Sequence, residues 1–189
     1  MNRLYFIRHG KTAGNEQKRY IGRTDEPLSP AGRGELAGKA APPADIVSVS
    51  PLRRCRESAQ ILYPNAKPLV VEGFRECDFG DFEGKNYREL AGNADYQAWL
   101  DSNGTLPFPH GEDPLAFRAR CVRAFEGFAE TLREGQSAAL VVHGGTIMAI
   151  FAALALPKRE FYDWQIGNGQ GFCAVWDGKA LAFEGKLWQ

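Results

Sequence analysis

Two tripeptides carry side chains suited to chemistry on anions: Arg8-His9-Gly10 near the start of the chain and His143-Gly144-Gly145 near its end. The chain has three histidines, and these two directly follow apolar runs, Leu4–Ile7 and Ala139–Val142, that predict buried strands. Strands of an open α/β sheet bring their carboxyl ends to a common ligand-binding edge. A neutral imidazole is available as a nucleophile near pH 7, and a guanidinium binds anions through a planar fork. The pattern therefore indicates phosphoryl chemistry.

A second basic group follows another predicted strand. Arg53, Arg54 and Arg56 fall in the first turn or so of a helix that Ser50-Pro51 is expected to open, with serine as N-cap and proline at the first helical position. Cations are unfavourable at the positive end of a helix dipole. A bound anion would remove this conflict, because free backbone N–H groups at a helix start also bind anions. A lone arginine is usually just solvated, but three after a strand end favour a site role for one of them.

The acidic candidates lie between residues 75 and 84. Glu76 and Glu83 stand there near Phe79 and Phe82. A general acid must hold its proton near pH 7, well above the ordinary glutamate pKa of about 4.3. Burial beside the phenylalanines would raise the pKa of such a carboxyl. The third histidine, His110, is expected in a loop, at most as a contact at the rim of the site.

The pattern of apolar residues and turn signals predicts an α/β fold. Strands are expected at 4–7, 46–49, 69–71 and 138–142, helices at 29–40, 50–63, 114–135 and 146–156, an irregular loop at 11–28, and a terminal hairpin of 172–176 with 181–183 that turns at Asp177-Gly178. Strands that alternate with helices predict a three-layer α/β/α sandwich with a mainly parallel central sheet.

Two stretches need separate mention. Residues 72–111 mix aromatic side chains with glycines and acids, and we expect them to form a covering insertion over one end of the sheet, with a short helix at 95–101. The helix that Pro114 opens is expected to bury one apolar face. That face consists of Leu115, Val122, Phe125, Ala129 and Leu132.

Composition limits the classes of partner. A length of 189 residues predicts a single domain. The formal net charge of zero gives no global field that would favour nucleic acid or an anionic membrane. No leader pattern or apolar run of about 20 residues is seen. The four cysteines are scattered singly, which predicts free thiols and a cytoplasmic location. We expect a monomer or homodimer acting on a small phosphorylated metabolite.

Several motifs occur in a fixed order along the chain. They are Phe6–Thr12 with Asn15, Gly22 with Asp25, Ser50–Cys55, Phe74–Glu76 with Gly80 and Glu83-Gly84, Gly111-Glu112 with Arg120, and Val142–Gly145. Together they resemble the histidine phosphatase superfamily, also called the phosphoglycerate mutase-like family. Within it, the chain is most similar to small bacterial phosphatases, including the alpha-ribazole phosphatases of cobalamin synthesis.

The resemblance implies a role for each matched residue. His9 would attack phosphorus, and Glu76 would protonate the leaving alcohol. Arg8, Arg54 and His143 would hold the phosphoryl oxygens. The further expected substrate- or phosphate-binding residues are Asn15, Gly22, Glu83 and Gly144. The resemblance implies no metal and no cofactor.

Two other functions remain open at this point. A phosphoglycerate mutase would use the same groups, but this chain is shorter than the glycolytic mutases. A more open cover would expose the phosphohistidine to water and favour hydrolysis. A non-catalytic phosphate-binding module would not need Glu76 beside the basic groups. We therefore expect a phosphomonoesterase, with alpha-ribazole 5′-phosphate as one candidate substrate.

Overall fold

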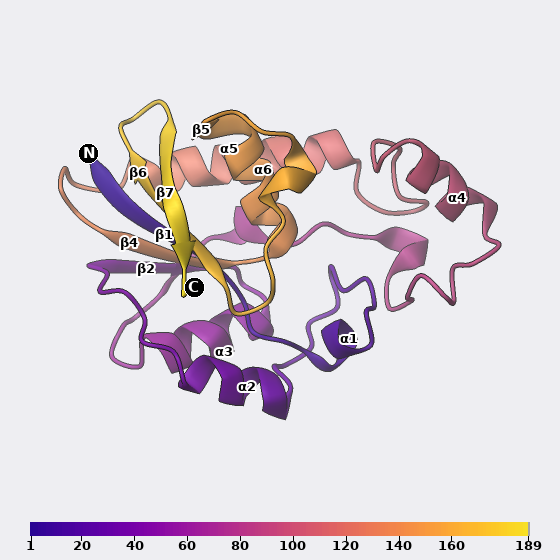
Figure 1. The fold of residues 1–189 in the computed structure, drawn as a ribbon, viewed down its shortest axis with the longest axis horizontal. Coiled ribbons are helices and arrows are strands. Elements are labelled where there is room, and N and C mark those ends of the chain that lie inside the picture. The colour runs from indigo at the N-terminus through magenta and orange to yellow at the C-terminus, as the bar shows by residue number, and fades with distance from the viewer. Residues whose placement is uncertain (189) are drawn as a thin grey trace.

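A sheet of seven strands forms the centre of the computed structural model, which describes residues 1–188 (Figure 1). The strands are β1 (Asn2–Arg8), β2 (Ile46–Val49), β3 (Leu69–Val70), β4 (Ala138–Val142), β5 (Ala155–Leu156), β6 (Gly171–Trp176) and β7 (Leu181–Leu187). Their order is β3-β2-β4-β1-β6-β7-β5. Strand β6 pairs antiparallel with both β1 and β7, and the other neighbours pair parallel. The predicted mainly parallel sheet is confirmed.

Helices cover both faces of this sheet. The helices of the described residues are α1 (Ala13–Glu16), α2 (Pro30–Ala37), α3 (Arg53–Leu62), α4 (Ala94–Asp101), α5 (Pro114–Ala129) and α6 (Gly144–Leu154), with short 3-10 helices η1 (Glu72–Phe74), η2 (Gly80–Phe82) and η3 (Phe161–Trp164). Figure 1 shows α5 and α6 on one side of the sheet, α2 and α3 on the other, and α4 beyond its end. The three-layer sandwich is therefore confirmed.

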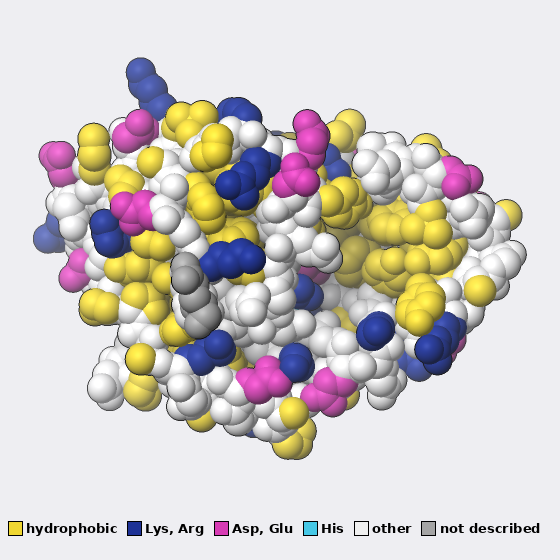
Figure 2. Space-filling model, in the orientation of Figure 1, with side chains coloured by type: hydrophobic (Ala, Val, Ile, Leu, Met, Phe, Trp, Pro, Cys, Tyr) yellow, Lys and Arg dark blue, Asp and Glu magenta, His cyan; other side chains and the backbone are white. Residues whose placement is uncertain are grey.

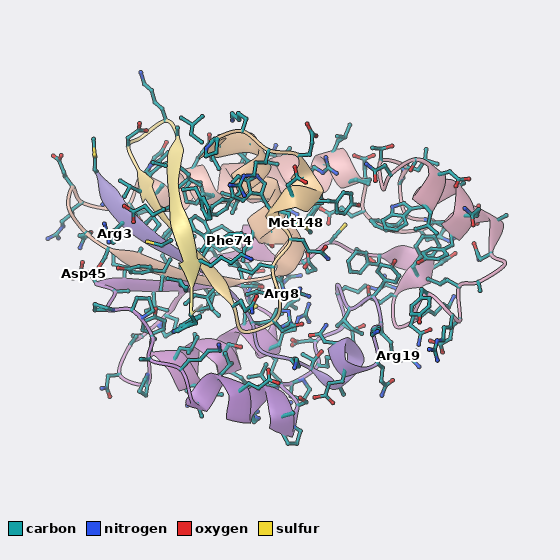
Figure 3. All side chains as sticks on the ribbon, viewed as in Figure 1. Arg3, Arg8, Arg19, Asp45, Phe74 and Met148 are labelled. Carbon is teal, nitrogen blue, oxygen red and sulfur yellow. The ribbon has the colours of Figure 1, made fainter. Side chains whose placement is uncertain are left out.

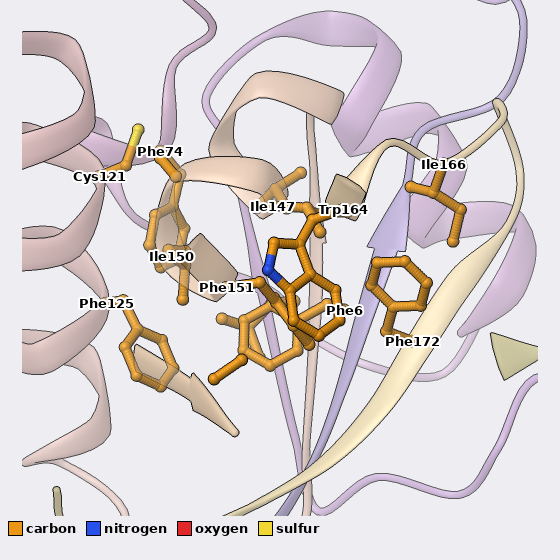
Figure 4. Packing of buried hydrophobic residues seen from close by; sticks show 14 of the residues in the cluster. Phe6, Phe74, Cys121, Phe125, Ile147, Ile150, Phe151, Trp164, Ile166 and Phe172 are labelled. Atoms are coloured by element: carbon orange, nitrogen blue, oxygen red, sulfur yellow. The ribbon is translucent and has the colours of Figure 1, made fainter. Parts of the chain in front are cut away.

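Strand β1 holds the layers together because its side chains alternate between two cores. Leu4 and Phe6 face the α5–α6 layer, whereas Tyr5 and Ile7 face the α2–α3 layer. The Phe6 ring packs edge-on against Phe151, with ring centroids 4.9 Å apart (Figure 4). Burying one such side chain stabilises the fold by about 1.5–3 kcal/mol. This packing fixes the strand whose carboxyl end carries the first predicted site residues.

The boundaries of three helices in the first third of the chain differ from the predictions. Helix α3 begins at Arg53 without a side-chain cap; the Ser50 hydroxyl bonds to His143 and accepts a 3.4 Å hydrogen bond from the N–H of Leu52. Ser29 does cap α2, which then ends at Ala37 rather than at residue 40. The loop expected at 11–28 contains α1, whose first turn is closed by Thr12 and Asn15.

The end of α6 also differs from the predicted helix at 146–156. Helix α6 starts two residues earlier, at Gly144, and ends at Leu154. Ala155 and Leu156 form β5 beside β7. Leu156 precedes Pro157, and a residue before proline avoids the helical conformation.

The buried face of α5 matches the predicted one only in part: Phe125 and Ala129 are buried as predicted. Leu115 is 67% exposed, and the helix ends at Ala129 instead of continuing to residue 135. The fully buried side chains include Phe117, Cys121, Phe125 and Phe128. Both faces have helical spacing, and the position of α6 and η1 against the helix selects the more aromatic one.

The remaining local predictions agree with the structure. The β6–β7 hairpin turns at Asp177, whose Oδ1 accepts hydrogen bonds from the N–H groups of Lys179 and Ala180. Helix α4 begins one residue before the predicted start and is capped by Asn93. The four cysteines are free. None of the helices in residues 1–188 has the length and apolar character that a bilayer crossing requires.

Candidate active site

His9 is held in one tautomer at the end of β1. Its side chain is 3% exposed, and its Nδ1 lies 2.7 Å from the carbonyl oxygen of Gly10. A carbonyl oxygen can only accept, so Nδ1 carries the proton of the neutral ring and Nε2 keeps a free lone pair. Burial lowers the pKa of His9 well below its ordinary value, and the positive charges of Arg54 and Arg8 lower it further. His9 is therefore a neutral nucleophile.

His143 lies beside His9 at the start of α6. The two ring centroids are 5.2 Å apart, with the rings inclined at 67°. The Nε2 of His143 forms a 2.7 Å hydrogen bond with the Ser50 hydroxyl, and the Cys55 Sγ lies 3.5 Å from the same nitrogen. Burial lowers the pKa of His143 too, followed by the charge of Arg54. The predicted meeting of the two histidines is therefore confirmed by the geometry.

Two arginines bring positive charge to this point without an acidic partner in the described part of the chain. Arg54 is fully buried, and its guanidinium donates to the carbonyls of Thr24, at 2.7 Å, and Gly22, at 2.8 Å. Arg8 donates to the carbonyl of Ile166 at 2.6 Å. The Nε atoms of both arginines are buried and have no hydrogen-bond partner. Guanidinium groups that are at least partly buried and form no ion pair attract an anion.

Glu76 approaches the same region from the segment after η1. Its carboxylate accepts hydrogen bonds from the backbone N–H groups of Cys77 and Gly145, each at 3.1 Å. Burial raises the pKa of Glu76, although these N–H groups and the two arginines oppose the rise. A carboxyl group that keeps its proton to higher pH suits a general acid.

Asn15 belongs to the site, and its orientation is fixed by a residue that sequence reasoning missed. Its Oδ1 accepts a hydrogen bond from the Asn168 side-chain amide at 3.0 Å and from the backbone N–H of Thr12. The same Asn168 amide donates to the carbonyl of His9 at 3.2 Å. With Oδ1 occupied, the Nδ2 group of Asn15 is left as a donor.

The other expected binding residues divide into two groups. The backbone of Gly144 lines the cavity against the Arg8 guanidinium. Gly22 and Glu83 do not line it. Glu83 instead accepts hydrogen bonds from the N–H groups of Gly22, at 2.8 Å, and Thr24, at 2.9 Å. The Glu83 carboxylate thus holds the loop whose carbonyls bind Arg54, and a substrate contact for Glu83 stays a prediction.

The site opens into a cavity of about 330 Å³. Its polar lining includes Arg8, His9, Asn15, Arg19, Glu76, Arg118 and Gly144, whereas Arg54 and His143 do not line it. Its walls are largely aromatic, from Tyr20, Phe79, Trp99, Phe108, Phe117, Phe161 and Tyr162. Figure 2 shows hydrophobic side chains gathered in a hollow on the side of α4, and Figure 3 shows Arg8 between the helix of Met148 and the loop of Arg19. The volume suits a small metabolite.

His110 lies outside this constellation. Its imidazole is exposed and bonds to Asp81 at 3.0 Å, and His110 does not line the cavity. His110 is therefore a loop residue, as expected, and it makes no contact at the rim of the cavity.

Comparison with known proteins decides the family. The profile of the Histidine phosphatase superfamily (branch 1) matches residues 4–186. The chain belongs to this superfamily. A broad-specificity phosphatase of Saccharomyces cerevisiae is 32% identical to this histidine phosphatase over 174 residues, which cover 84% of the chain and 72% of the relative.

Two further relatives are bacterial. The adenosylcobalamin/alpha-ribazole phosphatase of Salmonella typhimurium is 27% identical over 177 residues, covering 88% of this chain and 87% of the relative. The crystal structure of the alpha-ribazole phosphatase from Shigella flexneri superposes with a TM-score of 0.84 and 24% identity, covering 97% of this histidine phosphatase and 95% of that chain. This likeness confirms the phosphoglycerate mutase-like fold.

Proposed function

We propose that this histidine phosphatase hydrolyses phosphomonoesters of small metabolites through a phosphohistidine at His9. One observation carries the proposal: the free Nε2 of a neutral His9 lies beside the guanidinium groups of buried Arg54 and half-buried Arg8, and neither arginine forms an ion pair within residues 1–188. This arrangement attracts a phosphoryl dianion and offers it a nucleophile.

In the first step, the His9 Nε2 attacks phosphorus and the bond from phosphorus to the leaving oxygen breaks. The protonated Glu76 carboxyl gives its proton to that oxygen, so a neutral alcohol departs. Arg8 and Arg54, together with His143, stabilise the charge on the three phosphoryl oxygens during transfer. The Nδ1–H group of His9, held on the Gly10 carbonyl, stabilises the positive ring that forms.

In the second step, the Glu76 carboxylate takes a proton from water as the water oxygen attacks phosphorus. The bond between phosphorus and Nε2 breaks, which returns His9 to its neutral form and releases inorganic phosphate. The hydrogen bonds from Cys77 and Gly145 keep Glu76 in place for both steps. Dividing the reaction in this way is covalent catalysis.

Some of the binding residues are proposed to contact the phosphoryl group, and others to hold the loop that orients Arg54. We propose that the Asn15 amide and the Gly144 backbone N–H contact the phosphoryl group. Gly22 and Glu83 act indirectly, because they hold the loop that orients Arg54. A side chain at Gly22 would overlap the carbonyl oxygen of Cys77, so this support requires glycine.

The chain is proposed to act as a single domain in which residues 72–111 cover the cavity. Support comes from Phe79, Trp99, Gly104 and Phe108 of this segment, all of which line it. The free cysteines fit a cytoplasmic enzyme, and we propose a monomer or homodimer. Alpha-ribazole 5′-phosphate is the candidate substrate that the names of two relatives suggest.

The test is a phosphate-release screen of phosphometabolites in excess EDTA. The panel contains alpha-ribazole 5′-phosphate, sugar phosphates and an aryl phosphate, and a parallel assay follows interconversion of 2- and 3-phosphoglycerate. We expect phosphate release that chelation leaves unchanged. Isomerisation faster than release would identify a mutase. Binding of phosphate analogues without turnover of any ester would identify a non-catalytic phosphate-binding module.

A further inference from the structure

We propose that Arg118 selects substrates whose leaving alcohol carries a second negatively charged group, such as a carboxylate or another phosphate. The proposal rests on the phosphomonoesterase function given above and extends it to the part of the substrate that departs. Arg118 lies on α5 and lines the cavity, and no sequence motif pointed to it.

The charges around the cavity leave Arg118 without a partner. A phosphoryl dianion at His9 is balanced by Arg8 and Arg54. Arg19 also lines the cavity, but it forms an ion pair with Glu89 at 2.8 Å. Among the described residues, Arg118 has neither an ion pair nor a hydrogen bond, and the only carboxyl that lines the cavity is that of Glu76. One positive charge therefore remains after the phosphoryl group is bound.

Arg118 is held in place by stacking. Its guanidinium carbon lies 3.9 Å from the centroid of the Phe161 ring. Stacking uses the flat face of a guanidinium and leaves the N–H groups at its edge free to bind an anion. The side chain is thus oriented in advance, which lowers the entropy lost on binding.

Arg118 also lies on the side of the cavity where the leaving group must sit. The preceding residue, Phe117, lies close to the proposed proton donor, Glu76. Both side chains border the same small space beside Gly145, where an added Cβ would overlap Glu76 Oε1 and lie 3.0 Å from Phe117 Cζ. Glu76 protonates the leaving oxygen, so the space beyond it receives the rest of the alcohol. Tyr162 lines that space with Arg118, and its ring packs edge-on against Phe161, the ring on which Arg118 stacks, with the two ring centroids 5.0 Å apart.

Aryl phosphates whose leaving groups differ by one charge test this selection. Phenyl phosphate has a neutral leaving group, and 3- and 4-carboxyphenyl phosphate add a carboxylate to the same ring. We expect Arg118→Gln to leave kcat/KM for phenyl phosphate within about 2-fold of wild type. We expect it to lower kcat/KM for at least one carboxyphenyl ester by about 10-fold to 100-fold, the range for a hydrogen bond to a charged group. Arg118→Lys should retain part of the preference.

The control is Arg123→Gln, which removes an exposed arginine from the same helix outside the cavity. It should leave all the ratios unchanged. An unchanged ratio of kcat/KM values in Arg118→Gln overturns the proposal. If that ratio is unchanged because charged and neutral esters lose equally, Arg118 attracts anions in general, and if neither ester loses, Arg118 does not act on the substrate. Absence of turnover of phenyl phosphate by the wild type would instead contradict the phosphomonoesterase function itself.

Discussion

The cavity has two regions of different composition: a polar floor, where the phosphoryl group is proposed to bind, and largely aromatic walls. The floor is a group of mostly buried polar residues at strand ends and helix starts: His9 and Arg8, which line the cavity, and His143 and Arg54, which do not line it themselves. The walls are aromatic rings from loops and short helices, such as Trp99. The floor acts on the phosphoryl group that every substrate shares, whereas the walls meet the part that varies. Changes in the floor should therefore slow all substrates, and changes in the walls should alter preference among them.

The largest effect is expected from removing the nucleophile. His9→Ala should lower kcat by about 10⁴-fold or more for every ester, because loss of a covalent catalyst leaves only binding and charge stabilisation. Steady-state phosphate release measures this. His110→Ala, which removes the exposed histidine, should keep wild-type activity. A His9→Ala enzyme that loses less than 10-fold would mean that another group attacks phosphorus.

Glu76 should show an effect that depends on the leaving group. Glu76→Gln should lower kcat for alkyl phosphates by about 10²-fold to 10⁴-fold, and much less for p-nitrophenyl phosphate, whose leaving group needs no proton. Pre-steady-state kinetics on both esters measure the difference. Equal losses on the two substrates would assign Glu76 a role other than proton donation.

The pH profile follows from the same groups. Burial lowers the pKa of His9, so the nucleophile stays neutral below the ordinary value of 6.5 and is lost only as pH falls through the lowered pKa. Burial raises the pKa of Glu76, so its acid form is lost as pH rises through the raised pKa. We expect a bell-shaped kcat/KM profile for alkyl esters. Its alkaline limb should disappear in Glu76→Gln, and a limb that persists there would belong to another group.

Arg54 should have a smaller but uniform effect. Arg54→Lys keeps the charge but loses the fork that binds the Thr24 and Gly22 carbonyls, so we expect a fall in kcat of about 10²-fold to 10³-fold for all esters. Arg56→Lys on the same helix is the matched control and should be neutral, because Arg56 is exposed. Losses that differ strongly between esters would place Arg54 with the walls and not with the floor.

The smallest effect is expected in the walls. Trp99→Ala should raise KM for aryl phosphates by roughly 2-fold to 10-fold, the value of one aromatic contact. Inhibition by inorganic phosphate, which occupies only the floor, should stay unchanged. Leu100→Ala removes an exposed neighbour on α4 and serves as control. Weaker phosphate inhibition in Trp99→Ala would show that floor and walls are not independent.

Sequence reasoning succeeded in the floor for a physical reason. A buried strand followed by a polar residue and glycine is a local pattern, and parallel strands bring such ends to one edge. His9, His143 and Arg54 therefore converge as predicted. Residue types alone offered both Glu76 and Glu83 as the acid, and the family resemblance selected Glu76. Its position depends on a hydrogen bond from Gly145 that no local pattern reveals.

The supporting contacts could not be predicted in the same way. Ser50 carries a clear helix-capping signal, yet its hydroxyl bonds to His143, 93 positions away. The buried face of α5 was predicted at Phe125 and Ala129 but not at Phe117, Cys121 and Phe128. Two apolar stripes share helical spacing, and only tertiary packing chooses between them. Arg118 and Asn168 have no motif, since their roles arise from segments that meet only in the folded chain.

Direct observation of the phosphorylated enzyme tests the central claim most sharply. Wild-type enzyme is mixed with excess substrate, quenched in alkali within milliseconds, digested and mapped by mass spectrometry, with His9→Ala treated in parallel. We predict an acid-labile phosphoryl group on His9, formed and lost fast enough to account for turnover and absent from the variant. A phosphoryl group on another residue, or rapid turnover with none trapped at His9, would contradict the account.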